Sequence, residues 1–179
     1  MTTKILTPLA RLSYPYLDNA DDNGKYRCEL IFEDGTDVTA LNDAVQAAIE
    51  EQFGSKPPKG LVMPVRQGDV HREGKDGYED ALFISANTTF TPDLCKGVRV
   101  AGKVDYRPVE AGEIYAGCYV YANVTAKAWE HSENGMSRKG IKFYLNSVVK
   151  VRDGEPFGGA AFNPSESYSE IDPAAFGDE

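Results

Sequence analysis

The stretch Tyr119-Val120-Tyr121-Ala122-Asn123-Val124-Thr125-Ala126-Lys127-Ala128-Trp129 decides what kind of fold this chain adopts. Successive side chains of a β-strand point to opposite faces of the sheet. One face of this strand carries small apolar side chains, at Val120, Ala122, Val124, Ala126 and Ala128. The other carries rings, hydrogen-bonding groups and one positive charge, at Tyr119, Tyr121, Asn123, Thr125, Lys127 and Trp129. The pattern predicts a strand that packs its apolar face on a core and turns its rings toward water.

This strand is expected to belong to a long hairpin. It would extend over 114–129 with a bend at Gly117, and a hairpin loop over 131–140 would follow it. A returning strand is expected over 141–151, because apolar and polar residues alternate there. Its inward side chains are expected to be Ile141, Phe143, Leu145 and Val149. Its outward side chains are expected to be Lys142, Tyr144, Asn146, Lys150 and Arg152.

Other segments also favour strands. Strands are expected over 4–16, 25–33 and 82–90, and the segment 25–33 alternates well between apolar and polar residues. The segment 97–107 alternates strongly as well. One side of it is expected to carry Val98, Val100, Val104 and Tyr106, and the other Arg99, Lys103, Asp105 and Arg107.

One helix and one long loop complete the expected elements. Asp37 is a candidate N-cap, apolar residues recur at helical spacing from Leu41, and Gly54 would end the helix near Phe53. The segment 66–80 is polar and rich in glycine, so we expect a long surface loop. Many strands, one helix and frequent turns predict an all-β fold with a minor helix, either a small barrel or a sandwich.

Charge is unevenly distributed along the 179 residues, whose formal net charge is −9. Residues 163–179 hold five acidic residues and no lysine or arginine, whereas residues 96–152 hold ten basic against five acidic residues. We therefore expect one domain over 1–162 and a flexible acidic tail over 163–179. A solvated face with a solubilising tail is the alternative interpretation. Three cysteines without metal-ligand spacing argue against a disulfide framework, and no apolar run is long enough to span a bilayer.

The ring-bearing face is the best candidate for a binding site. Unpaired bases stack on aromatic side chains whatever their sequence, and each stacked base contributes about 1–3 kcal/mol. The candidate rings are Tyr119, Tyr121, Trp129 and Tyr144. The candidate phosphate contacts are Arg99, Lys103, Arg107, Lys127 and Lys142. The pattern predicts a surface for single-stranded nucleic acid, and packing of the tyrosines under loops or against a partner chain is the competing interpretation.

A catalytic role has less support in the sequence. The acidic loop Asp69–Asp80 offers oxygen ligands of the kind that hold Mg²⁺, which leaves a magnesium-dependent nuclease as an alternative. Basic residues interleave with these acids, and the sequence has neither a catalytic triad pattern nor a phosphate-binding glycine loop. We expect a protein that is not an enzyme and needs no cofactor. A structural or assembly protein, whose tyrosines meet another subunit, is a second alternative.

The acidic tail contains two apolar residues, Ile171 and Phe176. Such a segment can dock in a basic pocket of a partner, or lie on the basic surface of its own domain and compete with DNA. The candidate partner-binding residues are Asp172, Phe176, Asp178 and Glu179. A disordered solubilising end is the alternative.

Three motifs occur in a recognisable order. They are Ile-Tyr-Ala-Gly-Cys-Tyr-Val over 114–120, Gly-Ile-Lys-Phe-Tyr-Leu-Asn-Ser-Val over 140–148 and Asp-Gly-Glu-Pro-Phe-Gly-Gly over 153–159. With the helix near 41–53 and the loop that carries Arg66, Gly68, Asp69, Gly77 and Tyr78, this order resembles a family of bacteriophage single-stranded-DNA-binding proteins. The resemblance covers roughly residues 4–160.

The resemblance implies an OB-fold (oligonucleotide/oligosaccharide-binding) barrel of five strands with an added helix, long loops and a disordered acidic C-terminal tail. It implies sequence-independent binding and protection of single-stranded DNA in phage DNA replication or recombination. It also implies that the tail recruits phage replication proteins and restrains DNA binding. In many such tails an aromatic residue is last or nearly last, whereas here three residues follow Phe176. The expected location is the cytoplasm of the infected bacterial host, with no membrane partner, and the sequence leaves the oligomeric state open.

Overall fold

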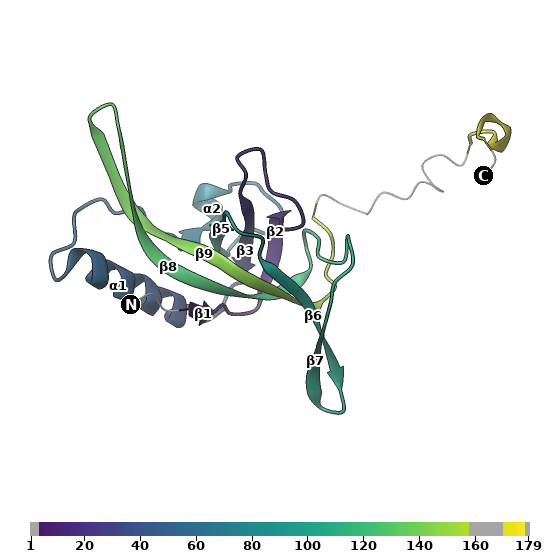
Figure 1. Ribbon diagram of the computed structural model, residues 1–179, viewed down its shortest axis with the longest axis horizontal. Helices are drawn as coiled ribbons and strands as arrows, with labels where there is room; N and C mark the ends of the chain where they lie inside the picture. The colour runs from purple at the N-terminus through teal and green to yellow at the C-terminus, as the bar shows by residue number, and fades with distance from the viewer. Residues whose placement is uncertain (1–3, 158–169, 178–179) are drawn as a thin grey trace.

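Strands dominate the computed structural model of this protein, which describes residues 4–157 and 170–177 (Figure 1). The strands are β1 (Lys4–Leu6), β2 (Ala10–Tyr16), β3 (Tyr26–Phe32), β4 (Arg66–Gln67), β5 (Leu82–Thr88), β6 (Asp93–Val100), β7 (Lys103–Arg107), β8 (Tyr119–Glu133) and β9 (Met136–Arg152). The helices are α1 (Thr39–Phe53), α2 (Gly68–His71) and the 3₁₀-helix η1 (Pro173–Ala175).

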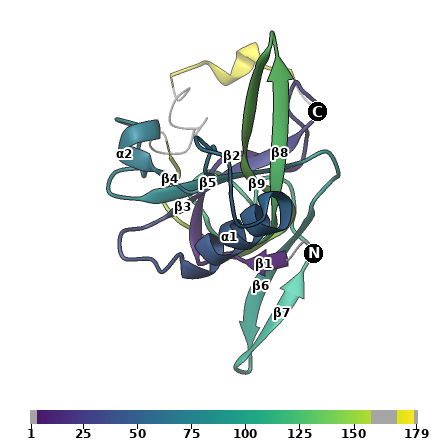
Figure 2. The ribbon, with the colours of Figure 1, turned by 90° about the vertical axis from the view of Figure 1, so that its left-hand side faces the viewer.

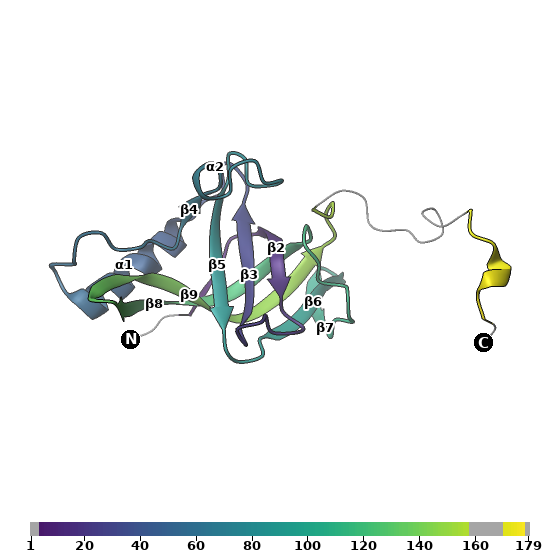
Figure 3. The same ribbon diagram turned by 90° about the horizontal axis from the view of Figure 1, so that it is seen from above.

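Five of the strands pair in a closed ring. β2 pairs with β3, β3 with β5, β5 with β9 and β9 with β8, and β8 returns to β2. All of these pairs are antiparallel except β5 with β9. Figure 3 shows β2, β3 and β5 crossing the long β8–β9 pair. A ring of five strands is the architecture of the OB fold, so the expected OB-like fold is confirmed.

The ring encloses the main hydrophobic core. Val120, Ala122 and Val124 are no more than 1% exposed, so the small apolar face of β8 points inward as predicted. Helix α1 packs against β8 and β1 beside the ring (Figure 1). It buries five apolar side chains there, at Leu41, Ala44, Val45, Ala48 and Ile49. Removal of this apolar surface from water is the main stabilising contribution to such a core.

The ends of α1 have clear local causes. Asp37 Oδ1 accepts hydrogen bonds from the backbone N–H of Thr39 at 3.0 Å and from its hydroxyl at 2.6 Å. The carboxylate thus satisfies one of the free N–H groups at the start of the helix. The N-cap residue is Val38, one position later than predicted. Gly54 ends the helix with a φ of 68°, a conformation that costs glycine little.

The β8–β9 hairpin is longer than the sequence predicted. The loop expected over 131–140 is wrong, because the strands pair as far as Glu133 and Met136. Only Asn134 and Gly135 form the turn, and both have positive φ, as two-residue hairpin turns require. At its other end β8 begins at Tyr119, so the expected strand start near 114 is also wrong. Residues 127–142 form an arm that projects from the ring (Figures 1 and 2).

A bulge in β9 makes one of the predicted inward side chains of this strand wrong. Val124 pairs with Leu145 and Asn123 pairs with Ser147, which makes Asn146 an extra residue in the strand. A bulge shifts the alternation by one position. Val148, instead of the predicted Val149, is therefore the fully buried residue beyond it.

The expected strand over 97–107 is two strands. Ala101 and Gly102, both with positive φ, form a turn that folds the segment into the β6–β7 hairpin. Arg99 pairs with Val104, and residues paired across two strands lie on the same face.

The predicted sides of this segment are therefore wrong. Tyr106 pairs with Gly97 and so shares the face of Arg99 and Val104. The opposite face carries Val98, Val100, Lys103, Asp105 and Arg107. Strict alternation holds only within one strand, and the turn resets it.

The segment 66–80 is not a surface loop throughout. After β4 and α2 it lies over the outer face of β3 and β5, where Tyr78 is only 2% exposed. The Tyr78 hydroxyl donates to Glu29 Oε1 at 2.7 Å, and Arg72 pairs with the same carboxylate through Nε and Nη2, at 3.1 and 2.7 Å. A buried carboxylate is stable only with such partners. The network therefore holds the segment on the sheet.

Candidate nucleic-acid interface

Polar and aromatic side chains cover the outward face of β8 and β9. We call this surface the outer stripe. Pairing sets Lys127 opposite Lys142, and Thr125 opposite Tyr144. The members of the outer stripe are Tyr119, Tyr121, Asn123, Thr125, Lys127 and Trp129 on β8, and Lys142, Tyr144, Asn146, Val149 and Arg152 on β9. None of its four rings is buried, so the predicted outward register of the rings is confirmed.

Tyr144 has two lysines beside its ring. The ammonium nitrogens of Lys142 and Lys127 lie 4.4 and 5.5 Å from the ring centroid. Both distances are within the range of about 6 Å over which an aromatic face attracts a cation. The two lysines face each other across the strands, so an anion placed between them interacts favourably with both. This arrangement suits a base on the ring and a phosphate beside it.

Hydrogen bonds order the middle of the outer stripe. Asn146, the extra residue of the bulge, donates through Nδ2 to Asn123 Oδ1 at 3.0 Å and to Thr125 Oγ1 at 2.9 Å. A bulge re-aims a side chain in this way. These polar groups bind one another, so the rings and charges at either side of them are the parts of the stripe that are free to meet a ligand.

A groove lies where the outer stripe meets the β6–β7 hairpin. Its volume is about 340 Å³, and its lining includes Tyr121 and Val149 from the stripe and Arg99, Val104 and Tyr106 from the hairpin. Tyr106 is 63% exposed. Alternation along the sequence assigned Arg99 and Tyr106 to opposite sides, and the turn at 101–102 brings them together. Sequence reasoning therefore missed Tyr106 as a site residue, although Gly102 was a signal for the turn.

Two predicted stacking residues have other contacts. The guanidinium of Arg152 lies 4.2 Å from the ring centroid of Tyr119, whose hydroxyl donates to Glu33 Oε1 at 3.0 Å. Trp129 lies against Gly140, where a Cβ atom would come within 2.9 Å of its ring. Val62 pairs with Gly140 there and connects the arm to the segment after α1. Tyr121 and Tyr144 are thus the rings of the stripe with most freedom to accept a base.

The predicted cations fall into two groups. Arg99, Lys127 and Lys142 border the outer stripe or its groove. Lys103 and Arg107 lie on the other face of the β6–β7 hairpin, and Arg107 Nε pairs with Asp105 at 2.8 Å. Phosphate binding by these two residues remains a prediction, and it would require a path over that second face.

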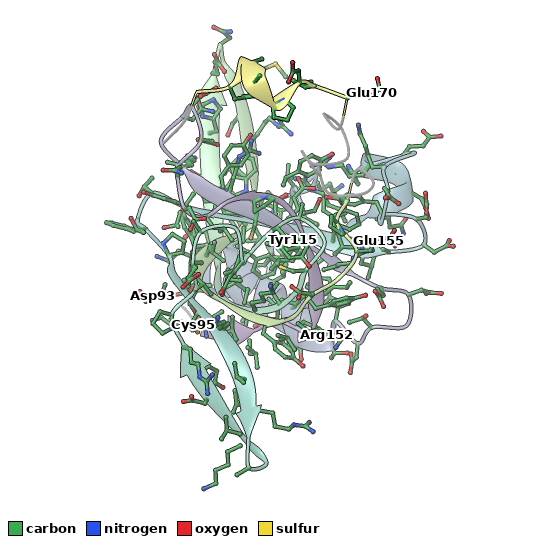
Figure 4. The ribbon with its side chains drawn as sticks, turned by 90° about the vertical axis from the view of Figure 1, so that its right-hand side faces the viewer. Asp93, Cys95, Tyr115, Arg152, Glu155 and Glu170 are labelled. Atoms are coloured by element: carbon green, nitrogen blue, oxygen red, sulfur yellow. The ribbon has the colours of Figure 1, made fainter. Side chains whose placement is uncertain are left out.

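Ion pairs occupy two further lysines, Lys96 and Lys150, which line one pocket with Tyr115, a residue labelled in Figure 4. Lys150 Nζ lies 2.6 Å from Asp153 Oδ1 and 5.0 Å from the ring centroid of Tyr115. Its hydrogen bond, followed by that from Tyr115, lowers the pKa of Asp153. In the same way, the hydrogen bond from Lys96 lowers the pKa of Glu113. These carboxylates stay ionised and compensate the two lysines, which makes them weaker phosphate contacts than Lys127 and Lys142.

The described part of the tail, 170–177, contains η1. Asp172 Oδ1 accepts a hydrogen bond from the Ala174 N–H at 3.0 Å, and Pro173 begins the turn. Ile171 and Phe176 are both exposed. The predicted tail residues Asp178 and Glu179 lie outside the described residues.

Within 4–157 and 170–177, no group of three or more His, Cys, Asp or Glu residues is arranged to hold a metal ion, and this includes the acidic loop Asp69–Asp80. No helix of the described residues is long and apolar enough to cross a membrane.

Comparison with known sequences finds phage proteins. Residues 3–175 match a family described as the single-stranded-DNA-binding protein of Enterobacter phage Enc34. Protein p50 of Acyrthosiphon pisum secondary endosymbiont phage 1 is 26% identical over 158 residues, which cover 82% of this chain and 79% of p50.

Comparison with solved structures also finds phage proteins. The single-stranded DNA-binding protein from bacteriophage Enc34 in complex with single-stranded DNA is similar with a TM-score of 0.64 and 26% identity, over 87% of this chain and 89% of that one. Gp2.5, a single-stranded DNA-binding protein of bacteriophage T7, is similar with a TM-score of 0.52 and 15% identity, over 100% of both chains. At that identity the likeness to gp2.5 concerns the fold alone.

Proposed function

This chain belongs to the family of single-stranded-DNA-binding proteins described from Enterobacter phage Enc34, and we propose that it holds single-stranded DNA on the outer stripe and in the adjoining groove. The observation that carries this placement is the ring of Tyr144 with the ammonium groups of Lys142 and Lys127 beside it. A flat ring and two cations on one solvent-facing sheet match the two chemical parts of a nucleotide, its base and its phosphate.

Binding on this surface combines stacking with charge neutralisation. Bases stack on Tyr144 and Tyr121, and a stacked base contributes about 1–3 kcal/mol. Lys127, Lys142 and Arg99 neutralise phosphates and release counterions from the DNA. A duplex keeps its base faces inside the helix, so only an unpaired strand can use the rings. Every base has an aromatic face, so binding is independent of sequence.

The net charge of −9 is compatible with this role because the charges are segregated. The basic excess over 96–152 includes every cation of the outer stripe and its groove. Local potential, rather than net charge, steers a charged ligand to its site, since charges beyond about 10 Å are screened at 0.1 M salt.

Membership in this family supports the biological role that we propose. The protein protects single strands during replication or recombination of phage DNA, in the cytoplasm of the infected bacterium. It is a binding protein and not an enzyme, like the family to which it belongs. The acidic tail recruits replication proteins of the phage, and its exposed Ile171 and Phe176 are the apolar contacts available for such a partner.

Fluorescence anisotropy with labelled oligothymidine, alone and annealed to its complement, tests the function. We expect tighter binding of the single strand and a loss of affinity as salt rises. Equal affinity for both forms would contradict the proposal. Tyr144→Ala and Tyr144→Phe test the placement. Alanine should weaken binding about 5- to 150-fold, and phenylalanine, which keeps the ring, should bind like the wild type.

A further inference from the structure

A second aromatic surface lies on β2, outside the outer stripe. The structure has a cavity of about 490 Å³ there, which we call the β2 pocket. Its lining includes Tyr14, Pro15, Tyr16, Lys75, Tyr78 and Phe157. A volume of roughly 300–1,000 Å³ and a mostly apolar lining are typical of pockets for small organic groups. A flat aromatic group therefore fits this pocket.

Tyr14 has an unusual backbone conformation at this pocket. Its φ is 45°, and the pairing of β2 with β3 shifts register between Ser13 and Tyr16. A bulky residue with positive φ is a rare outlier that costs on the order of 1–3 kcal/mol and is concentrated at functional sites. Tyr14 is 44% exposed, so the strain does not serve burial of this residue in the core. It instead turns a ring toward the pocket and the solvent.

The floor of the β2 pocket is rigid. The ring of Tyr78 lies 6.4 Å from that of Tyr14 and packs edge-on against Phe83 at 5.2 Å. Its hydroxyl is held by the buried Glu29, which Arg72 binds through two nitrogens. Gly77 leaves room for the ring of Phe157, which a side chain there would meet. The pocket is therefore formed before any ligand arrives, which reduces the entropic cost of binding.

Cations surround the β2 pocket. Arg27 lies 4.7 Å from the ring centroid of Tyr16, Arg11 lies 4.2 Å from that of Phe157, and Lys75 is part of the lining. Two acids oppose them, because Asp76 also lines the pocket and Asp21 pairs with Arg27 at 2.8 Å. Arg11 and Lys75 are the cations left for a phosphate. Rings with neighbouring guanidinium groups suit a nucleotide better than an uncharged apolar ligand.

A continuous series of rings and guanidinium groups joins this pocket to the outer stripe. The guanidinium groups of Arg152 and Arg11 lie 4.2 and 6.0 Å from the centroid of the Tyr119 ring. The guanidinium of Arg11 also lies 4.2 Å from the centroid of the Phe157 ring. Arg11 and Tyr119 are partners in the β2–β8 pairing. Arg11 is held by backbone acceptors, Gly117 O at 3.1 Å and Glu155 O.

We propose that the β2 pocket binds a nucleobase of the same DNA strand that lies on the outer stripe, after the strand has turned around the ring over Arg11. This inference rests on the proposed function and adds a second binding site to it. It assigns Tyr14 and Tyr16 as stacking residues and Arg11 as the phosphate contact between the two sites. Short strands occupy one site, and longer strands occupy both.

Oligothymidines of about 4 to about 16 nucleotides, the range of site sizes of OB folds, test this inference. Tyr14→Asn removes the ring, and asparagine tolerates positive φ, so the fold is retained. We expect this variant to bind the longest strands about 5- to 150-fold more weakly than the wild type and the shortest strands equally well. Tyr14→Phe should bind like the wild type, and Tyr144→Ala should weaken binding at every length.

The outcomes separate the two proposals. If Tyr14→Asn equals the wild type at every length while Tyr144→Ala is weakened, the inference fails and the proposed function stands. If the wild type binds none of the strands, the proposed function itself fails.

Photocrosslinking with 5-bromodeoxyuridine needs no variant. Trypsin releases Tyr14 and Tyr16 together in the fragment 12–25, whereas Tyr121 and Tyr144 are released in 104–127 and 143–150, because the bond between Arg107 and Pro108 is not cleaved. Crosslinks in 12–25 with long strands are expected. Crosslinks confined to the fragments of β8 and β9 would overturn the inference.

Discussion

Replacing Lys142 by glutamine is the sharpest test of the outer stripe. Its ammonium lies 4.4 Å from the Tyr144 ring and opposite Lys127. Glutamine keeps most of the stem and removes the charge, so the sheet should be unaffected. The variant therefore measures one phosphate contact.

The magnitude follows from counterion release. For single strands, the logarithm of affinity falls with the logarithm of salt concentration by about 0.7 per neutralised phosphate. Apart from Lys150, which pairs with Asp153, four cations border the stripe and its groove, Lys127, Lys142, Arg99 and Arg152. If each neutralises one phosphate, the wild-type slope is about −2.8. Lys142→Gln should reduce its size to about 2.1, and the double variant with Lys127→Gln to about 1.4.

Anisotropy titrations of labelled oligothymidine over a series of KCl concentrations give the slope directly. Lys59→Gln, an exposed lysine in the connector after α1, is the matched control and should keep the wild-type slope. Thermal unfolding confirms that the variants fold. A slope for Lys142→Gln equal to that of the wild type, in a folded protein, would refute the placement of the DNA on this face.

Further outcomes are expected elsewhere in the molecule. Arg99→Gln should reduce the size of the salt slope by about 0.7, whereas Lys103→Gln should not, because Arg99 and Lys103 lie on opposite faces of the β6–β7 hairpin. Equal effects of the two substitutions in the same titrations would show that the DNA covers both faces. Gly140→Ala should destabilise the protein by about 1–3 kcal/mol in urea unfolding, because the new Cβ would lie 2.6 Å from the Val62 carbonyl oxygen. Gly177→Ala, with open space around it, is the control, and equal stability of the two variants would contradict the close packing of Gly140 on Val62. Hydrogen bonds from Lys150 and then from Tyr115 lower the pKa of Asp153, so the ionised Asp153 contributes to stability at neutral pH. This contribution is lost as the pH falls from the ordinary carboxyl pKa through the lowered pKa of Asp153. Asp153→Asn should remove this part of the pH dependence, and an unchanged pH profile of unfolding would argue against the ion pair. Deleting residues 163–179 removes five acidic residues and no basic ones, and should tighten binding of single strands at low salt; weaker or equal binding in the anisotropy assay would exclude competition by the tail.

The predicted side-chain orientation of β8 was confirmed because it depends on one strand alone. Small apolar residues at every second position indicate which face meets the core, and Val120, Ala122, Val124 and Ala126 are buried accordingly. The helix was also predictable, since its apolar spacing, the carboxylate of Asp37 and the stop at Gly54 act within a few residues.

The errors have a common physical origin. The face of Tyr106 depends on the turn at 101–102, and the burial of Val148 in place of Val149 depends on the bulge at Asn146. A one-residue shift in a strand reverses the face of every later side chain. The length of the arm was missed although Asn134–Gly135 is a strong hairpin signal.

The sequence by itself determined that this chain forms strands with rings and lysines on the outer face of β8 and small apolar residues on the inner face, because period-two alternation is a local property. Only the tertiary structure decided which rings and cations lie together. It brought Arg99 and Tyr106 next to Tyr121, and it placed Tyr78 of the segment 66–80 on Glu29 of β3. It also formed the β2 pocket with Phe157, which is 143 residues from Tyr14 along the chain. Such contacts depend on register between strands and on the closure of the ring, and no local pattern in the chain specifies either.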